Sequence, residues 1–159
     1  ERTVVFNGFS KAYAMTGLRL GYAMGPADAI GAMNRIHQYT MLSAPTTPQY
    51  AAIEALRSCD GDVADMREQY NRRRRFVLSR FDDMGLDCFE AKGAFYVFPE
   101  VPGDDEAFAE GLLQEHNVAA VPGRVFGEGG EGHLRISYAT GLNDLREAMA
   151  RLETFLDER

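Results

Sequence analysis

A lysine and an arginine eight residues apart are the side chains whose types and spacing best suit chemistry. Lys11 lies between two strand-like apolar runs, residues 3–6 and 18–24, and Arg19 lies within the second. Only two of the 17 basic residues are lysines, Lys11 and Lys92, so an amine at position 11 suggests chemistry that arginine cannot perform. Lysine can lose its proton and attack an aldehyde, whereas arginine stays protonated and suits a phosphate. This pair predicts a site for pyridoxal phosphate.

The segment from Gly8 to Gly21 reads GFSKAYAMTGLRLG and resembles the attachment signature of class I pyridoxal-phosphate aminotransferases. Residues 93–99, 121–123 and 133–139 resemble further landmarks of that family, in their usual order. The resemblance implies that Lys11 holds the cofactor through a Schiff base and that Arg19 binds the cofactor phosphate. It also implies that Arg135 binds the α-carboxylate of the substrate.

One position departs from the common form of the signature. Many relatives have a serine three residues before the lysine, where its hydroxyl contacts the phosphate, and this chain has Gly8. We therefore expect that contact to be absent or taken over weakly by Ser10, which becomes a candidate cofactor-binding residue.

The resemblance also predicts the fold class, an α/β protein of fold-type I. Residues 1–59 are expected to form the end of the large pyridoxal-phosphate domain, and residues 60–159 an α+β small domain. Complete family members are considerably longer, and this sequence begins directly in a strand pattern without methionine. We interpret it as the carboxy-terminal part of such a protein, and we expect the isolated segment not to turn over substrate.

Periodicity predicts helices at residues 27–42, 48–58, 62–84, 104–115 and 144–156, and short strands at 86–90, 94–98, 118–121 and 133–139. In the last strand, Arg135 alternates with Leu134 and Ile136 and so lies on the face opposite the apolar set. Without the family resemblance, a solvent-facing arginine would be the preferred interpretation.

The net charge of −7 argues against a nucleic-acid partner. The basic run 72–75 would fan around a helix that also carries acidic residues, so it is expected to be a solvated face. The cysteines, Cys59 and Cys88, lack metal-site spacing, and no metal is predicted. No apolar run is long enough to span a membrane and no signal peptide is visible, which predicts a cytoplasmic protein.

The predicted function is an aminotransferase of the aspartate or aromatic type. It would move an amino group from an α-amino acid to a 2-oxo acid, and the full-length protein is expected to be a homodimer. Two alternatives keep the same lysine and arginines. One is another fold-type I enzyme, such as a carbon–sulfur lyase, and the other is an aminotransferase-like sensor domain of a transcription regulator.

Overall fold

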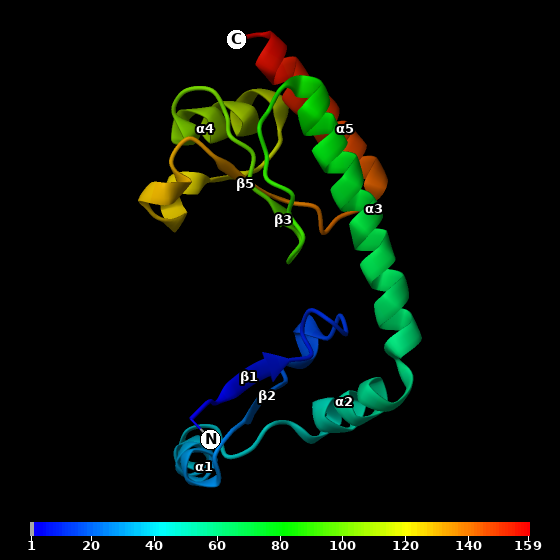
Figure 1. Ribbon diagram of the computed structural model, residues 1–159, viewed down its shortest axis with the longest axis vertical. Helices are drawn as coiled ribbons and strands as arrows, with labels where there is room; N and C mark the ends of the chain where they lie inside the picture. Colours follow the sequence, from blue (N-terminus) through cyan, green and yellow to red (C-terminus); the bar gives the residue numbers. More distant parts are fainter. Residues whose placement is uncertain (1) are drawn as a thin grey trace. The chain divides into compact units, whose positions relative to one another are not determined.

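The computed structural model describes residues 2–159 (Figure 1). The chain forms two compact units, Glu1–Met66 and Arg67–Arg159, and the boundary falls within helix α3 (Asp60–Met84). The assignment of residues 1–59 and 60–159 to a large and a small domain stays a prediction.

The first unit is built on an antiparallel hairpin of β1 (Val5–Gly8) and β2 (Gly21–Met24). Gly8 and Gly21 face each other at the end of this ladder that is closed by the connecting loop, and a Cβ on Gly21 would lie 3.1 Å from the carbonyl oxygen of Asn7. The missing side chains let the two strands approach closely where the connecting loop leaves them. The unit also contains the 3₁₀ turn η1 (Thr16–Leu18) and the helices α1 (Ala27–Thr40) and α2 (Thr46–Ser58).

The second unit contains a three-stranded antiparallel sheet in the order β3-β5-β4, with β5 (Leu134–Ser137) between β3 (Tyr96–Val97) and β4 (Val121–Pro122). Its other elements are α3, α4 (Asp105–His116), α5 (Leu142–Asp157) and the 3₁₀ turns η2 (Gly123–Phe126) and η3 (Glu128–Gly130). An ion pair between Arg80 and Glu153 joins α3 to α5, which run side by side (Figure 1). The mixture of helices and antiparallel strands agrees with the predicted α+β character of this region.

The core of the second unit lies between the sheet and its three helices. The largest fully buried side chains come from all of these elements and include Phe81, Phe108, Leu112, Leu134, Met149 and Phe155. The last helix turns an apolar face to this core, since Leu145, Met149 and Leu152 are buried and Leu156 is half-buried, at the helical spacing that predicted the helix. Burying these side chains removes apolar surface from water, which is the main favourable contribution to folding.

Several predicted elements differ in their bounds. Residues 86–90 form no strand, because this segment has no ladder partner. The last helix begins at Leu142, with Gly141 as its cap, two residues before the predicted start at residue 144. Helix α2 begins at Thr46, two residues before its predicted start at residue 48. Among residues 2–159, no helix is both long and apolar enough to cross a membrane.

Candidate functional site

The loop that carries Lys11 is wound around one backbone carbonyl. Phe9 is buried, and its carbonyl oxygen accepts hydrogen bonds from the amides of Tyr13 and Met15, both at 3.3 Å. The rings of Tyr13 and Tyr22 pack against the Phe9 ring, at 5.5 and 5.6 Å between centroids. Phe9 therefore anchors the turn, and Lys11 lies two residues farther along with an exposed side chain.

Arg19 returns the chain to the second strand in a left-handed conformation. Its φ is +55°, and its Nη1 donates a hydrogen bond of 2.8 Å to the carbonyl oxygen of Thr16. The hydroxyl of Thr16 in turn donates to the carbonyl oxygen of Ser10 at 3.1 Å. These bonds join both ends of the loop, so the structure brings the predicted cofactor residues Ser10, Lys11 and Arg19 together on one turn.

The donor set of this turn fits pyridoxal phosphate. A primary amine for the aldehyde carbon and a guanidinium for the phosphate are on the same short loop, and Arg19 is exposed. A guanidinium offers five donors in a planar fork, so one bond to Thr16 leaves others for phosphate oxygens. The role of each of these residues in binding the cofactor stays a prediction.

Lys92 has a different setting. Its amine forms an ion pair of 2.9 Å with Glu90, and the hydrogen bond from Lys92 lowers the pKa of Glu90. The amine of Lys92 is thus engaged by a carboxylate at the surface, and no arginine of an attachment signature follows it in the sequence.

An apolar cavity of about 580 Å³ lies in the same unit as the lysine turn, lined by residues of β2 and α2 together with Phe9, Leu20 and Ala44. Neither Lys11 nor Arg19 lines this cavity, so it is not the predicted cofactor site.

Arg135 lies on the exposed face of the second unit's sheet, as the alternating pattern predicted. Its neighbours Leu134 and Ile136 are buried, whereas Arg135 is half-buried. Strand β3 pairs with β5 so that Tyr96 is opposite Ser137, which places Tyr96 on the same face as Arg135. The Cζ of Arg135 lies 4.6 Å from the centre of the Tyr96 ring and 4.7 Å from that of Phe126.

We call Tyr96 and Phe126 the aromatic cradle of Arg135. Both rings contact the guanidinium through cation–π interactions, which hold its position without consuming its N–H donors. Within residues 2–159, no ion pair between Arg135 and an acidic side chain is found. The edge of the guanidinium is therefore suited to a carboxylate ligand.

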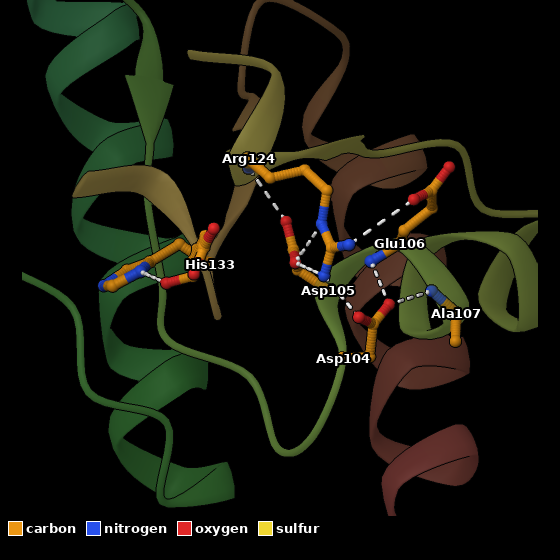
Figure 2. A network of polar contacts seen from close by, with 7 residues as sticks. Asp104, Asp105, Glu106, Ala107, Arg124 and His133 are labelled. Atoms are coloured by element: carbon orange, nitrogen blue, oxygen red, sulfur yellow. Dashed lines mark hydrogen bonds and ion pairs between the residues drawn. The ribbon is translucent and has the colours of Figure 1, made fainter. Parts of the chain in front are cut away.

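A polar network, which the sequence analysis missed, holds the turn that carries Phe126 (Figure 2). Asp105 is completely buried, and its Oδ2 accepts a hydrogen bond of 2.8 Å from the backbone amide of Arg124. Its Oδ1 accepts a second bond of 2.7 Å from Nε of Arg124 and lies 2.6 Å from Nη2. Hydrogen bonds from Arg124 lower the pKa of Asp105 from 3.8 to about 2, so this carboxylate stays ionised at neutral pH.

Asp104 completes the network at the start of α4. Its side chain caps the helix by accepting bonds from the amides of Glu106 and Ala107, at 3.0 and 2.9 Å, and it also pairs with Arg124 (Figure 2). Arg124 contacts Glu106 as well, at 3.5 Å. The only sequence signal for this network was the acidic run at residues 104–106, which correctly predicted the helix start.

A metal site would require a different grouping of side chains from these ion pairs. Among the residues that the structure describes, no three His, Cys, Asp or Glu side chains are grouped so that they could hold a metal ion.

Comparison with known proteins finds a family whose profile matches this chain. The profile of the family described as aminotransferase class I and II matches residues 1–152. Aspartate aminotransferase of Pyrococcus abyssi is 45% identical over 164 residues, covering 100% of this chain and 42% of its own length. Aromatic-amino-acid aminotransferase 2 of Thermococcus litoralis is 44% identical, with the same coverage of both chains.

The solved structures agree with the sequence matches. The crystal structure of the aromatic aminotransferase from Pyrococcus horikoshii superposes with a TM-score of 0.96 and 45% identity. It matches 100% of this chain, which in turn covers 44% of that structure. The chain thus spans less than half the length of the relatives that it matches.

Proposed function

Since the chain belongs to the class I and II aminotransferase family, we propose that it carries the reactive lysine and the carboxylate-binding arginine of a pyridoxal-phosphate aminotransferase. Its substrates would be an α-amino acid of the aspartate or aromatic type and a 2-oxo acid. The observation that carries this proposal is the turn that presents Lys11 and Arg19 together, on a loop with the predicted attachment signature.

In this proposal Lys11 and Arg19 hold the cofactor, with Ser10 as a weaker contributor. Bound pyridoxal phosphate supplies an electron sink that makes the Cα proton of an attached amino acid removable. The Lys11 amine would bind the aldehyde carbon of the cofactor in the absence of substrate. The Lys11 amine would also be the base that takes the proton from the substrate Cα.

Arg135 would select and orient the substrate. A guanidinium forms two parallel hydrogen bonds with a carboxylate, so it would hold an α-amino acid and aim its Cα bond. The cradle of Tyr96 and Phe126 supports this role because it restrains the guanidinium before substrate arrives. A homodimer and a cytoplasmic location are part of the same proposal and rest on the family resemblance.

The test is borohydride reduction of the full-length gene product with pyridoxal phosphate, followed by peptide mapping and a two-substrate assay. We expect a reduced adduct on Lys11, amino transfer to a 2-oxo acid, and loss of both in Lys11→Arg. Lys92→Arg is the matched control and should keep both, because Lys92 is paired with Glu90.

Other outcomes would separate the alternatives. An adduct on Lys11 without amino transfer would favour a carbon–sulfur lyase or a sensor domain. An adduct absent from Lys11 would refute the assignment of this loop as the attachment site.

A further inference from the structure

The two rings that contact Arg135 are held in different ways. Tyr96 belongs to strand β3, and its backbone is fixed by the ladder with β5. Phe126 is the last residue of the 3₁₀ turn η2, and its side chain is 51% exposed. The Phe126 ring also meets the Phe98 ring edge to face, at 6.2 Å between centroids, and its position against Arg135 further depends on how the turn itself is held.

The restraint on the turn comes from the start of α4. The carboxylate of Asp105 accepts bonds from both the backbone amide and the side chain of Arg124, two residues before Phe126. Figure 2 shows the Arg124 side chain lying among Asp104, Asp105 and Glu106 at the beginning of this helix. One buried carboxylate thereby ties the turn to the core through two independent bonds.

The other side of the turn is fixed by close backbone packing. The amide of Gly123 donates a bond of 2.7 Å to the carbonyl oxygen of His133, which precedes β5. A Cβ on Gly123 would lie 2.0 Å from the carbonyl oxygen of Gly130, so the two backbone segments touch with no room for a side chain. Turn η2 is thus held from α4 on one side and from the segment before β5 on the other.

We propose that Asp105 is a positioning residue for substrate recognition, because by fixing Arg124 and turn η2 it keeps the Phe126 ring against Arg135. This inference rests on the proposed function, in which Arg135 binds the α-carboxylate. Asp105 itself is buried beneath the turn and acts only through Arg124 and Phe126.

The position of Phe126 against Arg135 affects only the recognition of a substrate carboxylate. When Phe126 holds the guanidinium, the Arg135 side chain is already ordered before substrate arrives. Substrate binding then does not have to restrict the rotamers of Arg135. Loss of the Phe126 ring, or of the turn that holds it, would let the Arg135 side chain move and would weaken its binding of a carboxylate. A substrate amine without a carboxylate does not use Arg135, so its reaction would not change.

The experiment uses the full-length gene product with pyridoxal phosphate. It measures kcat and KM for amino transfer to one 2-oxo acid from an α-amino acid and from the corresponding amine that lacks the carboxylate. In Phe126→Leu we expect kcat/KM for the amino acid to fall by about five- to thirtyfold, mainly through KM, with the amine rate unchanged. Phe126→Tyr keeps a ring and should stay near the wild type. Asp105→Asn and the milder Arg124→Lys should reproduce the effect of Phe126→Leu.

Val125→Ala is the matched control, because Val125 is an exposed residue of the same turn. It should change neither rate. Equal losses for amino acid and amine in Phe126→Leu and Arg124→Lys would show a general structural defect and overturn the inference, and so would unchanged rates in both.

The failure of the proposed function has a different signature. It would appear as wild-type protein without amino transfer, or as an Arg135→Ala variant that still prefers the amino acid over the amine. If Arg135→Ala loses that preference while Phe126→Leu and Arg124→Lys keep it, the proposed function stands and only the positioning role is refuted.

Discussion

Replacement of Asp105 by asparagine should destabilise the second unit far more than the same change at its neighbour Asp104. The pKa of Asp105 falls from 3.8 to about 2 on folding, which corresponds to about 2 kcal/mol of stability at neutral pH. In addition, the new amide would turn one N–H₂ group toward the donors of Arg124. We therefore expect a loss of about 2–4 kcal/mol, below the upper range for buried pairs because Arg124 is partly exposed.

Asp104 provides the matched control. Its side chain is exposed, and asparagine caps a helix about as well as aspartate, so Asp104→Asn should cost only a small fraction of the loss caused by Asp105→Asn. Urea unfolding of the 159-residue chain, followed by far-ultraviolet circular dichroism, measures both variants against the wild type.

The pH dependence gives a second measure of the same ion pair. Because the folded pKa of Asp105 lies below its unfolded value, the stabilisation is complete above about pH 4 and is lost as the pH falls toward 2. The gap between wild type and Asp105→Asn should therefore shrink between pH 4 and pH 2. Equal costs for the two asparagine variants, or a gap that persists at pH 2, would refute the argument.

Two further predictions concern backbone positions. Gly123→Ala should destabilise the second unit by about 2 kcal/mol or more, because the new Cβ would overlap the Gly130 carbonyl, whereas Gly129→Ala, with nothing within 4 Å, should cost less than about 0.5 kcal/mol in the same urea assay. Arg19→Gly should leave stability within about 1 kcal/mol, because relief of the left-handed strain offsets the greater freedom of glycine in the unfolded chain. The same variant should weaken pyridoxal phosphate binding about tenfold or more in a fluorescence titration of the full-length gene product, and an unchanged affinity would remove Arg19 from the cofactor site.

The sequence predicted those features that depend on local signals. The acidic run at Asp104 correctly marked the start of α4, and the alternation around Arg135 correctly placed it opposite the apolar face. The family of the chain was also recognised correctly, from the signature between Gly8 and Gly21. Each of these depends on residues that are neighbours in the sequence.

The features that were missed depend on contacts between distant residues. Asp105 and Arg124 are 19 positions apart, and no periodic pattern links them. The contact of Phe126 with Arg135 requires the register of β4 against β5 and the turn that follows β4, neither of which periodicity specifies. The segment 86–90 had the composition of a strand but lacks a pairing partner, and composition alone cannot supply one.

Arg124 is bonded to Asp105 through both its backbone amide and its side chain, and this limits how the sequence of the protein can change in evolution. Asp105 contributes to the stability of the second unit and, in our proposal, to the position of Phe126 against Arg135. A mutation that moves Phe126 by loosening η2 would also lower the stability of the second unit. Selection would act against such a mutation before any gain in substrate range could spread. Tyr96 is fixed by a strand ladder that does not include this ion pair. New substrate preferences should therefore arise more readily through changes at position 96 than through changes in the turn.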